Sequence, residues 1–184
     1  MIRKEIEIKN SKAYVFDVDD TLVTTDAKII IRDSKDRIVK KITPAVYNTY
    51  EIGNGERFDF MEFDCPKIFR ETAKPTFFLS LMQKISKAVQ NKKSNSSVYI
   101  LTARTEKVKK EIHEFLKSKG IEISECHIHT IGDNQTHSVA EVKKQVLETI
   151  KKNHKKNVFF FDDDEKNLAL AKGLDGVKAR HVRI

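Results

Sequence analysis

The clearest pattern along the chain is a series of short apolar runs, each followed by charged or hydroxyl side chains. Runs rich in β-branched and aromatic residues that end in this way are typical of buried strands. On this pattern we predict strands at residues 13–17, 98–101, 125–131, 158–161 and 177–182. The alternating stretch at residues 2–9 predicts a further short edge strand or a lead-in to the first strand.

Apolar residues that recur every three or four positions fill most of the intervals between these strands. This spacing predicts helices at residues 75–91, 105–119, 138–153 and 165–172. Ser138 and Glu141 have the spacing of a capping box, which marks the start of the third helix. Strands that alternate with helices pair in parallel and are covered on both faces, so the predicted fold class is α/β with a central parallel sheet.

Residues 23–74 depart from this alternation and predict an insertion. Residues 28–41 predict a β-hairpin with a polar turn, which would form a flap, and Thr43 begins a short helix that extends to about Glu51. In residues 57–71, phenylalanines are interleaved with acidic residues. We expect them to dock an irregular segment onto the core, with a stacking surface for a nucleobase as the alternative. Residues 1–184 would then form one domain with this flap and a small cap inserted in it.

Polar residues gather where the predicted strands end. Asp17 and Asp19 are two positions apart, so an extended backbone directs both toward one pocket. Thr102 follows a second strand, and Asp162 and Asp163 follow a third. In open α/β sheets the carboxyl ends of parallel strands lie along one edge, where ligands bind. Clustered carboxylates repel one another unless a proton or a cation is bound, and an all-oxygen site suits Mg²⁺.

These residues resemble the motifs of the haloacid dehalogenase superfamily. The first motif, an apolar strand followed by D-x-D-x-T, corresponds here to Asp17, Asp19 and Thr21. The second is a strand that ends in Ser or Thr, here Thr102, the third is a lysine, and the fourth is a strand that ends in paired acids. The resemblance implies a Rossmann-like three-layer fold with the flap and cap inserted. The motifs occur in the expected order, at residues 13–22, 98–104, 138–147 and 158–167.

Helical spacing selects the lysine of the third motif. Lys143 lies four residues after Val139 and four before Leu147, inside the apolar stripe of the predicted helix, whereas Lys144 lies on its polar face. A lysine that points inward needs an anionic partner, which the acidic pocket and a bound phosphate would supply. We therefore assign Lys143, although its long stem could instead reach outward to solvent.

The resemblance also implies a role for each residue. Asp17 would attack phosphorus and form an aspartyl-phosphate, and Asp19 would protonate the leaving oxygen and then activate water. Thr102 and Lys143 would hold the phosphoryl oxygens, where charge concentrates during transfer. Mg²⁺ would be held by Asp17, by one of Asp162 and Asp163, and by the main-chain carbonyl of Asp19.

Arg104 is a further candidate to bind phosphate, because a guanidinium can donate two parallel hydrogen bonds to a phosphate group. The Thr-x-Arg pattern of residues 102–104 is similar to that of the 3′-phosphatase domains attached to polynucleotide kinases, and small phage-encoded members of the superfamily are another comparison. Those domains carry an acid four residues before the lysine, where this chain has Val139. This departure weakens the transfer of their substrate, though not of their chemistry. The residues assigned to substrate binding are Thr21, Thr102, Arg104 and Lys143.

Composition indicates the cellular compartment and the class of partner to expect. The 184 residues are 39% hydrophobic and 34% charged, with a formal net charge of +8. No apolar run approaches the length of a membrane span, the N-terminus does not resemble a signal peptide, and two cysteines give no disulfide framework, so we expect a cytoplasmic protein. The positive charge favours a polyanionic partner, although a basic surface can serve solubility alone. We expect Cys126, His127 and His129 to be ordinary strand residues rather than metal ligands.

The sequence thus predicts a Mg²⁺-dependent phosphomonoester hydrolase, with a nucleotide or polynucleotide 3′-phosphate as the favoured substrate. Basic residues of the flap would clamp a polynucleotide without reading its sequence. A phosphoprotein phosphatase is an alternative, because D-x-D-x-T also marks that branch of the superfamily. A third interpretation is a binding module without turnover that uses the acidic pocket to hold a metal or phosphate.

Overall fold

The central element is a parallel sheet with the strand order β10-β9-β1-β7-β8. This computed structural model describes residues 11–47, 49–91, 95–134, 136–154 and 156–184. The strand predicted at residues 2–9 lies outside these ranges. The strands of the sheet are β1 (Ala13–Phe16), β7 (Ser97–Thr102), β8 (Ile128–Thr130), β9 (Val158–Asp162) and β10 (Val177–His181).

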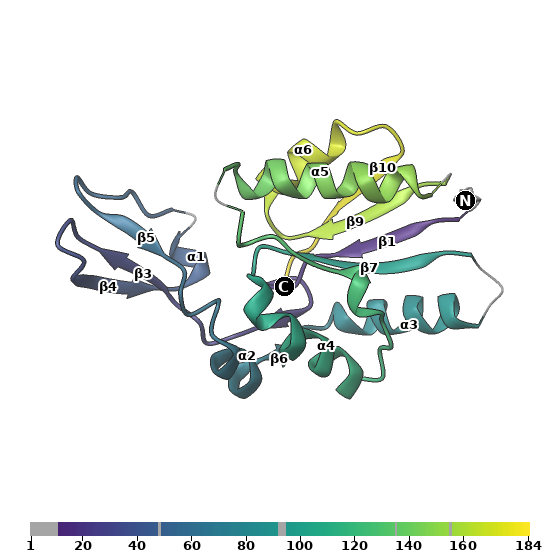
Figure 1. Cartoon of the computed structure of the whole chain (residues 1–184), viewed down its shortest axis with the longest axis horizontal. Coiled ribbons are helices and arrows are strands. Elements are labelled where there is room, and N and C mark those ends of the chain that lie inside the picture. Colours follow the sequence, from purple (N-terminus) through teal and green to yellow (C-terminus); the bar gives the residue numbers. More distant parts are fainter. Residues whose placement is uncertain (1–10, 48, 92–94, 135, 155) are drawn as a thin grey trace, which may run out of the picture.

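Helices cover both faces of this sheet and complete a three-layer arrangement (Figure 1). One face packs against α3 (Leu79–Gln90) and α4 (Lys109–Ser118). The other packs against α5 (Val139–Lys152) and α6 (Glu165–Lys172). The predicted α/β fold with a central parallel sheet is therefore confirmed.

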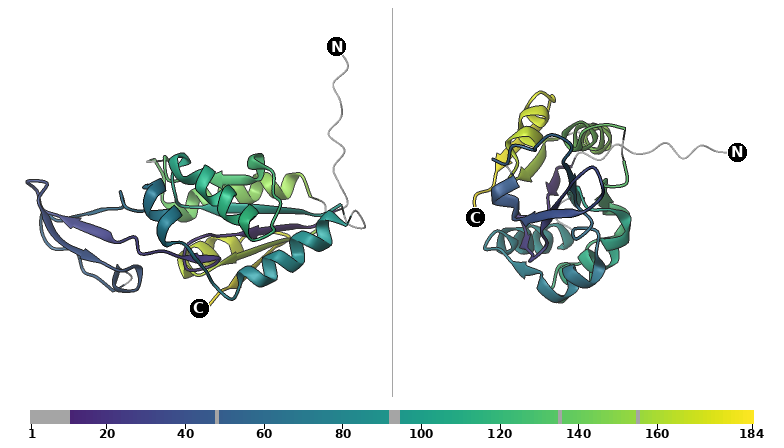
Figure 2. Two further views of the ribbon diagram at one scale, coloured as in Figure 1. Left: turned by 90° about the horizontal axis from the view of Figure 1, so that it is seen from below. Right: turned by 90° about the vertical axis from the view of Figure 1, so that its left-hand side faces the viewer.

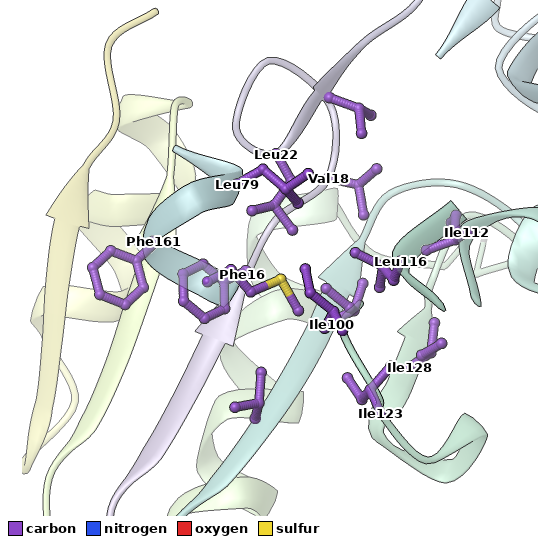
Figure 3. Close-up of a cluster of buried hydrophobic side chains, with 14 of the residues drawn as sticks. Phe16, Val18, Leu22, Leu79, Ile100, Ile112, Leu116, Ile123, Ile128 and Phe161 are labelled. Atoms are coloured by element: carbon purple, nitrogen blue, oxygen red, sulfur yellow. The ribbon is translucent and has the colours of Figure 1, made fainter. Parts of the chain in front are cut away.

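Alternation along the strands builds a separate apolar core on each face. In β1, Phe16 points toward α3 and α4, where its ring stacks on Phe161 at a centroid distance of 4.7 Å (Figure 3). The preceding residue, Val15, belongs to the opposite cluster together with Leu147 of α5. Because successive side chains of a strand point to opposite faces, residues two apart along β1 and β9 share a core. The same alternation aims the side chains that follow each strand.

Some predicted boundaries are wrong. The helix predicted from residue 75 begins at Leu79, because residues 74–75 form β6 (Lys74–Pro75) and pair antiparallel with β2 (Val23–Thr24). Phe77, inside the predicted helix, lies before α3 and is 69% exposed. Short 3₁₀ helices replace the first residues of the next predicted helix and strand, at Glu106–Val108 and Glu125–His127.

Residues 25–73, which we call the cap, lie between β2 and β6, which form a separate two-stranded sheet. Residues 29–47 and 49–59 of the cap project beyond the carboxyl-terminal edge of the central sheet (Figure 1 and Figure 2), whereas residues 66–72 lie beside α4. Its antiparallel sheet has the order β4-β3-β5, so the predicted hairpin is present as β3 and β4. The elements of the cap are β3 (Ile29–Arg32), β4 (Ile38–Ile42), α1 (Pro44–Tyr47), β5 (Arg57–Asp59) and α2 (Pro66–Thr72).

The second half of the cap differs from the prediction. The segment predicted to be irregular contains both β5 and α2, and the helix that was predicted to reach Glu51 ends at Tyr47. Phe58 and Phe63 pack on Ile29 and the other isoleucines of the cap sheet, rather than on the main core, because β5 pairs with β3. The organisation of residues 1–184 as a single domain stays a prediction. Within the described ranges, no helix is both long and apolar enough to cross a membrane.

Candidate active site

Three carboxylates converge at the carboxyl ends of β1 and β9. Val15 pairs with Phe160 across the two strands. Asp17 and Asp162 each lie two residues further on and therefore point to the same face of the sheet. Carboxylate oxygens of Asp17, Asp162 and Asp163 lie within 4.8 Å of one another. Asp17 is 5% exposed and Asp162 is fully buried, so their charges are largely removed from water.

Lys143 supplies a cation inside this acidic cluster. Its Nζ donates to Asp17 Oδ1 at 2.6 Å and to Asp162 Oδ2 at 2.7 Å. The predicted capping box is present at the start of α5, whose register directs the 2%-exposed Lys143 toward the sheet. The structure places Lys143, rather than the half-buried Lys144, against the acids. Its part in catalysis stays a prediction.

The charges of this cluster do not balance. Burial raises the pKa of Asp17 well above its usual value; Lys143 opposes this rise, and the carboxylate of Asp162 adds to it. Burial and the charge of Asp162 also raise the pKa of Asp163 to about 7. Burial alone would lower the pKa of Lys143, but Asp162 and Asp17 outweigh it and the pKa is raised. One lysine thus faces three carboxylates, an imbalance that a bound cation would correct.

Asp162 is also held by Asn167, a residue that the sequence analysis missed. Asn167 Nδ2 donates toward the two carboxylate oxygens of Asp162 at 3.1 and 3.2 Å. The main-chain N–H of Asp164 donates to Asp162 Oδ1 at 2.8 Å. Asn167 is 5% exposed and lies beside Leu168 on α6. A buried asparagine needs hydrogen-bond partners. An asparagine next to apolar residues that face the core was therefore the feature of the sequence that could have pointed to this contact.

Thr21 contacts the acidic cluster instead of lining an open pocket. Its Oγ1 donates to Asp163 Oδ1 at 3.4 Å, and its main-chain carbonyl accepts a hydrogen bond from Thr76 Oγ1 at 2.6 Å. The residue is fully buried. In this structure its hydroxyl contacts a candidate metal ligand, and substrate binding by Thr21 stays a prediction.

A tight turn separates the directions of Asp17 and Asp19. The N–H of Leu22 donates to the carbonyl of Val18 at 2.9 Å. Asp20 adopts a φ of 52°, in the left-handed region that aspartate tolerates better than most residues. As a result, Asp17 contacts α5 through Lys143, whereas Asp19 faces the loop after β7.

Arg104 lies in that loop and forms an ion pair with Asp19. Its Nε and Nη2 donate to the two carboxylate oxygens of Asp19 at 2.9 and 2.7 Å. Further N–H groups of the same guanidinium donate to the Phe63 carbonyl and to Thr25 Oγ1. Arg104 is 1% exposed, and a guanidinium buried to that degree needs a carboxylate partner. In this structure Asp19 occupies the fork of Arg104, and phosphate binding by Arg104 stays a prediction.

Thr102 and Gly132 define the path of the Arg104 loop. The Thr102 hydroxyl at the end of β7 accepts a hydrogen bond from the main-chain N–H of Arg104 at 3.2 Å. Gly132 N–H donates to the Arg104 carbonyl at 3.1 Å. A Cβ added at Gly132 would lie 2.3 Å from the Ala103 carbonyl oxygen, which is closer than atoms can pack. The loop therefore requires a glycine beside it, while phosphate binding by Thr102 stays a prediction.

The basic residues of the cap are balanced by its own acids. Residues 25–73 contain nine basic and nine acidic residues, whereas residues 74–184 contain 22 and 13. The cap as a whole therefore adds no net positive charge, while the clamp on a polynucleotide stays a prediction. Ion pairs of the hairpin, with their N–O distances, are Arg32–Asp59 (2.6 Å), Arg37–Asp33 (2.7 Å) and Lys41–Glu62 (2.7 Å).

Aromatic rings gather in the cap around Tyr47. Burial raises the pKa of Tyr47 in α1, and the charge of Asp164 adds to the rise. The Tyr47 ring packs edge-on against Phe58 and Phe60, at centroid distances of 4.8 and 5.6 Å. Phe60 is 42% exposed. A role of these rings in stacking on a nucleobase stays a prediction.

Comparison with known proteins assigns a family and supports the fold. A family model described as "Protein of unknown function (DUF2608)" matches residues 1–181. The chain belongs to this family. In fold it is similar to a chain in the "Structure of Pnkp1/Rnl/Hen1 complex", with a TM-score of 0.55 and 16% sequence identity. The alignment covers 100% of this chain but 51% of that one, so the DUF2608 chain spans about half of its length. No curated protein matches the chain.

The acidic cluster of this DUF2608 protein fits a hard divalent cation. Among the described residues, the group with metal-ligand spacing consists of Asp17, Asp162 and Asp163, all of which offer carboxylate oxygen. Within the described ranges, Cys126 and its neighbouring histidines do not form such a group. The Asp19 side chain is engaged by Arg104, so its predicted contribution to a metal would come from its main-chain carbonyl.

Proposed function

We propose that this protein hydrolyses phosphomonoesters with Mg²⁺ and through an aspartyl-phosphate, as a haloacid dehalogenase-type enzyme. The observation that supports this most strongly is the buried contact of Lys143 with Asp17 and Asp162, with Asp163 beside them, at the carboxyl edge of a parallel sheet. The motif resemblance assigns these residues to a nucleophile, metal ligands and a phosphate-binding lysine. The similarity to one chain of the Pnkp1/Rnl/Hen1 complex supports the fold.

The proposed reaction has two steps. Asp17 attacks phosphorus while the bond to the ester oxygen breaks, and that oxygen takes a proton from Asp19. In the second step Asp19 takes a proton from water, whose oxygen attacks the same phosphorus. The bond from phosphorus to Asp17 then breaks, which releases inorganic phosphate and restores the carboxylate. Lys143 balances negative charge at the reacting centre in both steps.

Mg²⁺ would supply the charge that lets an anionic ester approach an anionic nucleophile. The carboxylates of Asp17, Asp162 and Asp163 and the main-chain carbonyl of Asp19 would hold it. Without such a cation the single lysine leaves excess negative charge, which would repel a phosphate group.

A nucleotide or polynucleotide 3′-phosphate is the substrate class that we favour. The excess of basic residues in 74–184 supports attraction of a polyanion. The exposed edge of Phe60 in the cap supports contact with a planar base. Because the basic and acidic residues of the cap are equal in number, the flap adds little to this attraction of a polyanion.

Phosphate release from an aryl phosphate, with Mg²⁺ and with a chelator, tests the proposed activity. We expect release that requires Mg²⁺, and a higher kcat/KM on a 3′-phosphorylated oligonucleotide than on the matching mononucleotide, an advantage that shrinks as salt rises. Equal efficiency on both at low and physiological salt would indicate a small-molecule substrate, and a preference for a phosphopeptide would indicate a phosphoprotein phosphatase. Stabilisation by Mg²⁺ without release from any substrate would indicate a binding module.

Gly132→Ala should reduce turnover by about 10-fold or more, because its new methyl group must push the loop that carries Arg104. Gly173→Ala is the matched control, since its added Cβ would meet Leu170 O at 3.4 Å, which needs at most a small adjustment. Steady-state kinetics and circular dichroism of both variants check this prediction. Normal turnover of Gly132→Ala would show that the loop position does not matter for the reaction.

A further inference from the structure

We infer that Arg104 is a positioning residue that makes the orientation of Asp19 depend on the seating of the cap. This inference rests on the proposed function, in which Asp19 transfers protons. Its basis is that one guanidinium bonds at the same time to Asp19 and to two separate segments of the cap.

The hydrogen bonds between Arg104 and Asp19 fix the orientation of the Asp19 side chain. Two N–H groups of Arg104 meet two carboxylate oxygens of Asp19, so the plane of the carboxylate is fixed as well as its position. Asp19 keeps 26% of its side chain exposed, whereas Arg104 keeps 1%. The carboxylate thus faces the open side of the site while the arginine holds it from the protein side.

The contacts with the cap come from both of its ends. Thr25, just after β2, and the Phe63 carbonyl, before α2, accept hydrogen bonds from Arg104. The guanidinium carbon also lies 5.2 Å from the Phe63 ring centroid and 4.8 Å from that of Phe69 in α2. The next residue adds to the contact, since Thr105 N–H donates to Asp64 Oδ1 at 3.3 Å.

Burial makes these contacts interdependent. Phe69 belongs to the main core and packs against Phe115 of α4, so it would stay in place if the segments around Thr25 and Phe63 lifted. Arg104 would then lose two hydrogen-bond acceptors and the Phe63 ring and would gain water, so the geometry that it imposes on Asp19 would relax. The proton that passes between Asp19 and the leaving oxygen requires hydrogen-bond geometry. When the cap is seated, the Asp19 carboxylate is therefore oriented for proton transfer. When it is not seated, the contact between Asp17 and Lys143 is kept, but proton transfer by Asp19 is slower.

A series of substrates with different leaving groups separates this role from a merely structural one. A poor leaving group, such as an alkoxide, needs protonation by Asp19, whereas a good phenoxide leaving group does not. We expect Arg104→Lys, which keeps the charge but loses the fork, to lower kcat/KM for an alkyl phosphate about 10-fold more than for an activated aryl phosphate. Thr25→Val, which removes one cap acceptor and keeps Arg104, should change the ratio in the same direction but less. Arg180→Lys, the same substitution at an exposed arginine of β10 outside the cap, is the control that leaves the ratio unchanged.

Hydrogen exchange of the same proteins gives a readout that does not depend on activity. Arg104→Lys should speed exchange of amides in residues 61–72 relative to the wild type, and Arg180→Lys should not. An equal loss on alkyl and aryl substrates, or cap exchange unchanged in Arg104→Lys, would overturn the inference. If the wild type itself releases no phosphate, the proposed function fails, and the exchange experiment still decides whether Arg104 holds the cap.

Discussion

Replacing Asp17 with asparagine should reduce the turnover of phosphomonoesters by about 1,000-fold or more. The amide has nearly the same size and shape as the carboxylate, but it carries no negative charge and is a poor nucleophile toward phosphorus. The position is 5% exposed and bonded to Lys143, so a carboxylate from solution has little room to act in its place. Steady-state phosphate release from an aryl phosphate in the presence of Mg²⁺ measures the loss.

The same substitution should leave the free energy of unfolding unchanged or raise it when no metal is present. Three carboxylates lie together with one lysine, so the loss of one negative charge reduces their mutual repulsion. Asp164→Asn is the matched control, because it makes the same chemical change at an exposed residue that caps α6, where asparagine caps equally well. Urea unfolding and kinetics of both variants are compared. Near-normal turnover of a folded Asp17→Asn protein would exclude an aspartyl-phosphate at this residue.

The meeting of Asp17, Asp162 and Lys143 was predictable because it depends on local periodicity. Once β1 and β9 are parallel neighbours, alternation along each strand brings the two aspartates to one face. Helical spacing then turns Lys143 in the same direction as Leu147, toward that face. Both steps need only the period of an element and the fold class, which the apolar pattern supplies.

The partners of Arg104 were not predictable in this way. Arg104 and Asp19 lie 85 positions apart, and both belong to loops whose paths have no period. The chemistry of arginine suits a phosphate as well as a carboxylate, so the sequence leaves its partner open, and only the burial of the side chain and the cap around it decide.

Short elements of the cap were missed for a related reason. β5 has three residues and α2 has seven, which is too few for a clear period. β5 forms because it pairs with the free edge of β3. The position of that edge depends on the path of the chain into the cap, which the sequence pattern does not show. The pairing of cap cations with cap acids follows from the same arrangement, since Arg32 meets Asp59 across β3 and β5.

Replacing Lys143 with methionine should lower both turnover and stability. Turnover should fall by about 100-fold or more, because the variant loses a cation that faces the developing charge of the transferred phosphoryl group. The free energy of unfolding should fall by about 3 kcal/mol at neutral pH without metal, since Asp17 and Asp162 remain buried with their cation removed. Urea unfolding and phosphate release measure the two effects separately.

Added Mg²⁺ should recover part of the lost stability of Lys143→Met but not its turnover. A divalent cation among the carboxylates replaces the missing positive charge in the resting protein, whereas the ammonium contact with the transferred phosphoryl group stays absent. Lys144→Met makes the same substitution one position along α5, at a half-buried residue, and should change the free energy of unfolding by less than about 0.5 kcal/mol. A larger effect of Lys144→Met than of Lys143→Met would show that the register of α5 at the acidic cluster is different, and full recovery of turnover by Mg²⁺ would show that Lys143 serves the cluster alone and never the substrate.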